Sequence, residues 1–142
     1  MNNSIIAIMD KEHKRLLDLL LNIENDLNDI DNLKRSINNF KWNLEKHFFV
    51  EEKVIFKIYS NSIAEEIIDL NILIKEHRDI FWLLKKIENS IPKVKIEDLE
   101  NMKNDLLHHT DFEIKVFYPR LEEELEDEEK ALIKDRLDEF VG

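Results

Sequence analysis

The chain contains no cysteine, one glycine and two prolines among its 142 residues. Without cysteine there is no disulfide, no thiolate nucleophile and no cysteine-ligated zinc or iron–sulfur site. Few glycines and prolines leave little material for turns, which favours long uninterrupted helices over a sheet protein. No apolar run reaches about 18 residues, so we expect no membrane span. The first residues lack a basic region followed by an apolar core, so we expect no secretory signal.

The balance of charge is strongly acidic, with a formal net charge of −11 and a sequence pI of about 4.9. Such a chain is repelled by phosphate backbones, so nucleic acid is not an expected partner. Hydrophobic residues make up 43% of the chain, which is enough to build a core. We expect a single domain over residues 1–142, located in the cytoplasm and either monomeric or weakly homo-oligomeric.

Apolar residues recur at three- and four-residue steps in four long stretches, which indicates amphipathic helices. Because short loops force neighbouring helices to run antiparallel, the pattern predicts an all-α, antiparallel up-down-up-down four-helix bundle. The four stretches run from Ile5 to Leu27, from Leu33 to Ile58, from Ile63 to Leu84 and from Leu99 to Val116.

Local signals set the expected ends of these helices. Ser4 and Asp31 are the predicted caps of the first and second helix. Pro119 is expected to end or bend the fourth helix. A short fifth helix, from about Asp127 to Phe140, should follow and pack against the bundle. Its expected packing residues are Leu132, Leu137 and Phe140.

A histidine and a glutamate four residues apart occur twice, as His47 with Glu51 and as His109 with Glu113. This spacing places both side chains of each pair on one helical face. In the second helix that face is otherwise apolar, and a polar pair buried there is costly unless something satisfies it. A bound metal ion is one such partner.

Two further histidines complete an internal repeat. The tetrapeptide around His13 (Lys-Glu-His-Lys) matches the one around His77 (Lys-Glu-His-Arg), 64 residues later because 77 − 13 = 64. The two His-x-x-x-Glu motifs lie 62 residues apart, because 109 − 47 = 62. The chain therefore consists of two similar helical hairpins. Counted from the helix starts, all four histidines are expected near one level of the bundle.

Six donors of this kind suit iron, manganese or zinc and are too many for one tetrahedral zinc ion. The pseudo-twofold repeat makes two metal ions the natural count. Two histidines for each ion with both carboxylates bridging would leave room for a shared oxide or hydroxide and for an exogenous ligand. The predicted metal ligands are His13, His47, Glu51, His77, His109 and Glu113.

At these residues the chain resembles the hemerythrin-like (HHE cation-binding) family over nearly its whole length. The aromatic residues that follow each His-x-x-x-Glu motif, Phe56 and Tyr118-Pro119, are also family-like. The resemblance implies two iron ions in a di-iron centre with an oxo or hydroxo bridge. It also implies a function of binding O2, NO or a similar small ligand for storage, sensing or scavenging.

One position departs from the oxygen-carrying members of the family. They have an additional histidine one turn before the third-helix ligand, and here that position is Leu73. Its loss leaves both ions more open, as in relatives linked to repair of nitrosative and oxidative damage to iron–sulfur clusters. The alternative function is therefore a di-iron redox protein that handles peroxide or nitrosative damage, or an iron donor in cluster repair. A metal-free helical bundle used for protein contact is a third hypothesis.

Other polar residues near the motifs receive simpler readings. His108 is expected at a helix contact or in solvent, since the spacing to Glu113 favours His109 as the ligand. Glu52 is expected to border the site or to face solvent, and Glu12 is expected to be a surface charge. No nucleophile elbow, His-Glu-x-x-His motif or glycine-rich phosphate loop occurs, so no catalytic residue is assigned and a ligand-binding protein is preferred to an enzyme.

Overall fold

A computed structural model describes residues 4–63 and 68–141 of the chain. In these two segments every regular element is helical, as the scarcity of glycine and proline predicts. The elements are α1 (Ile5–Asn25), α2 (Ile30–Val50), η1 (Glu51–Phe56), α3 (Lys57–Ser62), α4 (Ile68–Ser90), α5 (Ile96–Phe112), η2 (Glu113–Phe117), α6 (Tyr118–Glu124) and α7 (Asp127–Val141).

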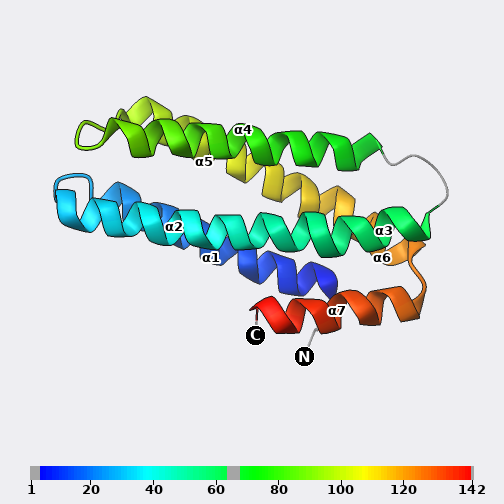
Figure 1. Cartoon of the computed structure of the whole chain (residues 1–142). Helices are drawn as coiled ribbons and strands as arrows, with labels where there is room; N and C mark the ends of the chain where they lie inside the picture. The colour runs from blue at the N-terminus through cyan, green and yellow to red at the C-terminus, as the bar shows by residue number, and fades with distance from the viewer. Residues whose placement is uncertain (1–3, 64–67, 142) are drawn as a thin grey trace.

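Four long rods form the body of the molecule (Figure 1). They are α1, the continuous run α2–η1–α3, α4, and the run α5–η2–α6. The short loops after α1 and α4 lie at one end of the bundle, so each hairpin is antiparallel, and α7 packs beside α1, α2 and α3. The prediction of an antiparallel four-helix bundle with a short C-terminal helix is confirmed.

The helix caps agree with the sequence at one of the two predicted positions. Ser4 caps α1, because its Oγ accepts a hydrogen bond of 3.1 Å from the backbone N–H of Ala7. The prediction for Asp31 is wrong: Asp29 caps α2, with its Oδ1 accepting from the N–H of Asn32 at 3.2 Å. Asp29 has an extended backbone, so the helix begins two residues earlier than expected.

Two other expected helix boundaries are also shifted. The fourth rod does not end at Pro119, which lies in the first turn of α6 where a missing N–H costs little. Ile63 does not open the third rod, because its backbone is extended (φ −106°, ψ 121°). The described part of α4 starts at Ile68.

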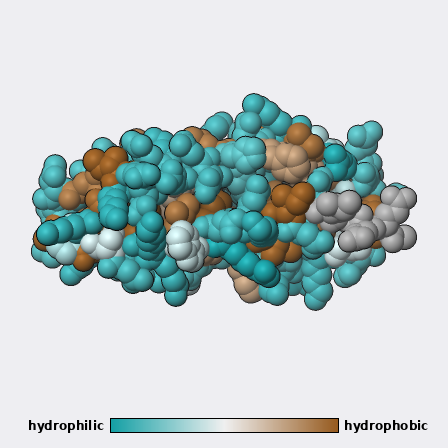
Figure 2. All heavy atoms as spheres, turned by 90° about the horizontal axis from the view of Figure 1, so that it is seen from above, coloured by the Kyte–Doolittle hydropathy of each residue, from teal (hydrophilic) through white to brown (hydrophobic). Residues whose placement is uncertain are grey.

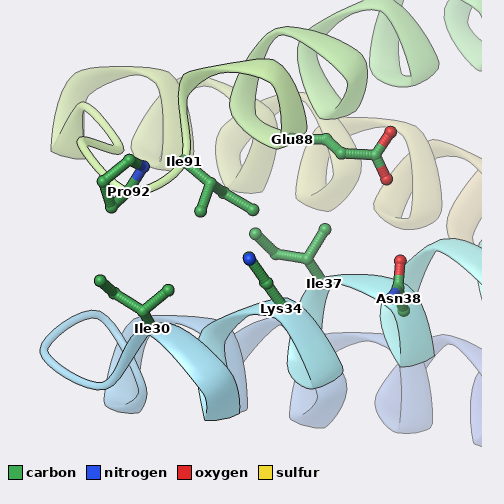
Figure 3. A pocket seen from close by; sticks show the side chains of 7 residues that line it. All are labelled: Ile30, Lys34, Ile37, Asn38, Glu88, Ile91 and Pro92. Carbon is green, nitrogen blue, oxygen red and sulfur yellow. The ribbon is translucent and has the colours of Figure 1, made fainter.

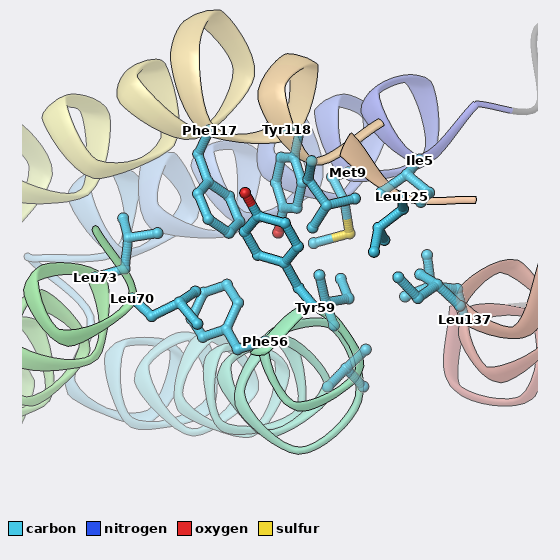
Figure 4. Packing of buried hydrophobic residues seen from close by; sticks show 14 residues of the cluster. Ile5, Met9, Phe56, Tyr59, Leu70, Leu73, Phe117, Tyr118, Leu125 and Leu137 are labelled. Atoms are coloured by element: carbon cyan, nitrogen blue, oxygen red, sulfur yellow. The ribbon is translucent and has the colours of Figure 1, made fainter. Parts of the chain in front are cut away.

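The core is divided into two apolar clusters by the level at which the four histidines lie. One cluster fills the end nearest the α1–α2 and α4–α5 loops and includes Leu16, Phe40 and Leu84. The other fills the opposite end and includes Met9, Phe56, Tyr59, Phe117 and Tyr118 (Figure 4). Polar donors therefore occupy a thin layer between two dry regions.

Helix α7 closes the second of these clusters. Ile133 and Leu137 are buried in it and Phe140 packs against it. The expectation for Leu132 is wrong, since 44% of this residue is exposed. Its neighbour Ile133 takes the inward position, because a shift of one residue turns a helical side chain by about 100°.

The surface is predominantly hydrophilic, and the face in Figure 2 shows apolar residues only in small scattered patches. Trp42 and Trp82 are 67% and 65% exposed. A hollow of about 570 Å³ lies between α2 and α4 near the loop end, where Ile37 and Pro92 help to line it (Figure 3). Ile37 precedes His47 by about 15 Å along α2, so this hollow is remote from the histidines. None of the described helices is long and apolar enough to cross a membrane.

Candidate metal centre

Each of the four rods contributes to one buried polar layer. The first and third rods supply one histidine each, and the second and fourth supply a histidine with a glutamate one turn later. Both carboxylates are fully buried, at 0% exposure, and no histidine of the set is more than 5% exposed. The six residues are His13, His47, Glu51, His77, His109 and Glu113, the same six that the sequence singles out.

The backbone changes its winding at each of the two carboxylates. The N–H of Glu51 donates to the carbonyls of both His47 and Phe48, and the π-helical segment η1 begins there. Glu113 has the same arrangement at the start of η2. Such π-helical turns occur frequently at functional sites. The repeated change in winding is a structural counterpart of the repeated His-x-x-x-Glu motif.

One half of the polar layer brings together residues of the first hairpin and one carboxylate of the second. His47 Nε2 lies 3.2 Å from Glu51 Oε1. His13 Nε2 lies 3.2 Å from Glu113 Oε1. The two imidazole rings meet edge to face with their centroids 5.0 Å apart.

The other half is built around the second hairpin. His77 Nε2 lies 3.1 Å from Glu51 Oε1 and 3.1 Å from His109 Nε2. His109 Nε2 is also 3.4 Å from Glu113 Oε1. Both imidazoles therefore point their Nε2 atoms at one position, with both carboxylates beside it.

The donors form two groups that share members. In each group, one donor atom from every residue lies within 4.8 Å of the others, a spacing that could hold a metal ion. Glu51 and Glu113 belong to both groups, so two adjacent positions would have the same two carboxylates between them. The groups are His13, His47, Glu51 and Glu113, and Glu51, His77, His109 and Glu113.

Unpaired polar atoms test whether this layer suits a metal ion. The described residues offer no hydrogen-bond partner to five buried atoms here, and such atoms cost about 1–3 kcal/mol each. The short N–O distances at His13 and His47 are therefore not hydrogen bonds, because the nitrogen and oxygen atoms point towards common positions rather than at each other. A pair of cations at those positions would satisfy four of the five, since each imidazole offers one nitrogen to the centre and His13 Nδ1 is left over. The five atoms are His13 Nδ1 and Nε2, His47 Nε2, and Glu113 Oε1 and Oε2.

In the metal-free protein, burial and neighbouring charges shift the pKa values of the two carboxyls in opposite directions. Burial on its own would raise the pKa of Glu51, but the neighbouring His47 and His109 hold that pKa well below its usual range. Burial and the adjacent Glu51 charge raise the pKa of Glu113 well above its usual range. Metal-free protein therefore keeps one carboxylate ionised and the other protonated, and metal binding must displace that proton.

The pKa values of His13 and His109 are shifted in opposite directions. Burial, with a smaller effect from His47, lowers the pKa of His13 to about 3. Burial opposes protonation of His109 as well, yet hydrogen bonds to Glu51 and Glu76 raise its pKa to about 8. The first hairpin thus presents a neutral imidazole ready to donate a lone pair to a cation.

Aromatic side chains shield the polar layer from both sides. Phe48 stacks on His77, with 3.7 Å between ring centroids and 11° between planes, and Phe56 lies 5.9 Å from the same ring. The Tyr118 hydroxyl donates to Glu51 Oε2. Tyr118 belongs to the second apolar cluster, where Figure 4 shows it, and its hydroxyl thereby fixes one of the two shared carboxylates.

Two residues of this environment are not predicted from the sequence. Tyr118 stands out there only as part of an aromatic tail, because the contact of its hydroxyl with Glu51 joins positions 67 residues apart. Glu76 accepts a hydrogen bond from His109 Nδ1 at 2.8 Å. Its place beside His77 in the repeated tetrapeptide was the available signal. Glu52 borders the site as expected, 2.7 Å from His77 Nδ1.

Two remaining predictions concern residues outside the six. His108 is exposed, whereas its neighbour His109 is buried and belongs to one of the two donor groups. Leu73 is fully buried in the second apolar cluster, where it adds no donor to the polar layer.

Comparison with known families agrees with this geometry. Residues 4–121 match the family model described as the hemerythrin HHE cation binding domain. The matched segment contains all six donors and ends within α6. Searches of curated proteins and of solved structures give no match.

Proposed function

Because the chain belongs to the hemerythrin HHE cation-binding family, we propose that it holds two iron ions and through them binds O2, NO or a similar small ligand. The observation that carries the proposal is the sharing of Glu51 and Glu113 by two overlapping donor groups. Shared carboxylates favour two cations side by side over one. The proposed ligands are the six residues of the buried layer.

The donor set favours a redox-active metal with open positions. Two histidines and two carboxylates give each ion four protein donors, and iron accepts more than four. Held by these residues, a pair of ferrous ions would supply open coordination positions for a diatomic ligand and the electrons to reduce bound O2. Two carboxylates balance only part of the charge of two such cations, which favours an additional anionic ligand.

The surrounding residues hold this set and keep water from it. Phe48 and Phe56 cover His77, and Phe117 lies between Phe56 and Tyr118 with ring centroids 5.4 and 5.2 Å apart. A dry apolar shell of this kind controls solvent access and tunes a metal centre. Tyr118 orients Glu51 through its hydroxyl. Small uncharged ligands are the class that such a layer admits most readily.

Leu73 favours a second candidate function. A buried leucine at this position provides no fifth histidine, so both ions keep an open position. Open positions on both ions suit reaction with peroxide or with products of nitrosative damage, or release of iron to an acceptor. We propose this as the alternative.

The test begins with protein loaded with ferrous iron without air. Elemental analysis should give two iron ions per chain, and exposure to O2 or NO should produce a new visible absorption band. The double variant His47→Ala with Glu51→Ala should lose iron and band together, whereas His108→Ala, one residue from a proposed ligand, should keep both. Iron-loaded protein without any spectral response to O2 or NO would refute the first function. Peroxide turnover, or iron transfer to an apo cluster protein, would support the second.

A further inference from the structure

The internal repeat invites a comparison of the two halves of the metal layer. The 64-residue offset pairs Glu12 with Glu76, because 12 + 64 = 76. The 62-residue offset pairs Glu52 with Ile114, because 52 + 62 = 114. If the two hairpins were equivalent, paired positions would make the same contacts with the histidines. These contacts differ between the two halves.

In the half that contains His77 and His109, each histidine has a carboxylate at Nδ1, the ring nitrogen that faces away from the centre. His77 Nδ1 lies 2.7 Å from Glu52 Oε2, and His109 Nδ1 lies 2.8 Å from Glu76 Oε1. The two carboxylate side chains are 31% and 27% exposed, so they border solvent. Each imidazole is held in one orientation with its Nε2 free to face a cation.

The other half lacks this support. His13 Nδ1 is buried and has no hydrogen-bond partner among the described residues. The equivalent of Glu52 is Ile114, a half-buried side chain that packs against the second apolar cluster. Glu12, the equivalent of Glu76, instead pairs with Arg15 at 3.8 Å. Within the described chain, the only carboxylate paired with His47 is Glu51, at its Nε2 atom.

Carboxylates at Nδ1 matter because they act on the metal through the imidazole. An ionised acceptor at Nδ1–H fixes the tautomer and raises the basicity of Nε2, and loss of such a partner typically costs 10–100-fold in metal affinity. Among the described residues, one half has two such partners on its histidines and the other has none. Since Glu51 and Glu113 are common to both halves, they do not offset this difference.

We propose that the two cation positions are unequal, with the position at His77 and His109 filling first and Glu52 and Glu76 acting as the positioning residues that make it tighter. This inference rests on the proposed two-metal function. At limiting metal the chain holds one ion in this half. The position at His13 and His47 is the one that fills last and gives up its ion first.

Calorimetric titration of metal-free protein with ferrous iron, in the absence of air, tests the order. Two steps of one ion each are expected, with affinities about 100–10,000-fold apart, since each of the two carboxylates contributes about 10–100-fold. His77→Ala should abolish the tighter step, and His13→Ala should abolish the weaker one. These histidines are equivalent in the repeat, so equal effects of the two variants would overturn the inference.

A second set of variants tests the carboxylates themselves. Glu52→Gln keeps the shape and removes the charge, and it should weaken the tighter step about 10–100-fold while leaving the weaker step unchanged. Ile114→Glu supplies the missing carboxylate and should tighten the weaker step, whereas Ile114→Gln should not. Thermal melting checks that the position-114 variants are folded. If they are not, Glu52→Gln and the histidine pair still decide the matter.

Failure of the proposed inequality can be distinguished from failure of the proposed two-metal function. Two ions bound with one affinity, and unchanged by Glu52→Gln, would overturn the inequality and leave the two-metal function standing. Absence of any iron binding by the unaltered chain would overturn both. Anomalous scattering from crystals grown with one equivalent of cobalt(II) gives an independent readout, since the ion should lie at His77 and His109.

Discussion

Replacing Glu113 by leucine should change stability in opposite directions with and without metal. In the metal-free protein this residue is fully buried, and neither of its carboxylate oxygens has a hydrogen-bond partner among the described residues. Leucine removes both unsatisfied atoms and fills most of their volume. An unsatisfied buried polar atom costs about 1–3 kcal/mol, and we expect a gain of about 2 kcal/mol here because leucine removes two such atoms.

The pKa of Glu113 gives this gain a pH dependence of known sign. Burial and the charge of Glu51 raise the pKa of Glu113 in the folded state above its value in the unfolded chain. A carboxyl of this kind favours folding below about pH 4.5 and loses that contribution as pH rises. The advantage of leucine in metal-free protein should therefore be larger at pH 8 than at pH 5.

With metal present the effect reverses, because Glu113 is a proposed ligand of both ions. A ligand at 1,000 times its dissociation constant stabilises the folded state by about 4 kcal/mol, and the variant should lose most of that gain. Urea unfolding measures both states. A slope of about 2 kcal/mol per molar urea converts the metal-free gain into a midpoint about 1 M higher.

The matched control lies on the same rod. Glu100 is an exposed residue of α5, so Glu100→Leu should change the free energy of unfolding by less than about 0.5 kcal/mol in either state. A Glu113→Leu variant that is less stable than the unaltered chain without metal would refute the reasoning. It would mean that the buried carboxyl is satisfied in solution.

Three further predictions follow from the same layer. Verified chelation of the metal should lower the melting temperature by about 15 °C, and an unchanged transition would mean a shallow or solvated site. Tyr118→Phe removes the hydroxyl that donates to Glu51, so it should lower the free energy of unfolding by about 2 kcal/mol and weaken metal binding. The control Tyr59→Phe loses a hydrogen bond to Glu124 away from the centre and should affect stability alone. Urea unfolding and calorimetry compare the two variants. His13 has a folded-state pKa of about 3 against 6.5 unfolded, so its contribution is present above pH 6.5 and lost as pH falls towards 3, by about 1.4 kcal/mol per pH unit. His13→Leu should flatten that part of the metal-free stability profile, and parallel profiles for the two chains would contradict the assignment.

Helical periodicity carried most of the fold prediction. Long amphipathic stretches with few glycines and prolines permit little other than a helical bundle, and short loops make the neighbours antiparallel. Two features that depend on a choice between nearby residues were not predicted correctly. Asp29 rather than Asp31 caps α2, and Ile133 rather than Leu132 faces the core. Local propensity at these positions differs too little to select one neighbour over the other.

Residue type and spacing, repeated in two hairpins, were sufficient to select the six donors of the buried layer. Four imidazoles and two carboxylates on apolar stripes are too costly to bury without a shared reason, and a repeat removes most coincidences. The repeat also predicted that each hairpin supplies one lone histidine and one His-x-x-x-Glu motif, whereas the grouping of the two histidines of a hairpin in one half of the layer came from the structure. The choice of the six donors required no knowledge of side-chain positions.

Tertiary structure alone decided which atoms support those donors. Glu52 reaches His77, Glu76 reaches His109 and Tyr118 reaches Glu51, each from another rod of the bundle. Such contacts depend on the rotation and depth of one helix against another, quantities that the spacing within a single helix does not contain. The sequence therefore determined the donor set, whereas the packing of the rods determined which carboxylates reach its histidines.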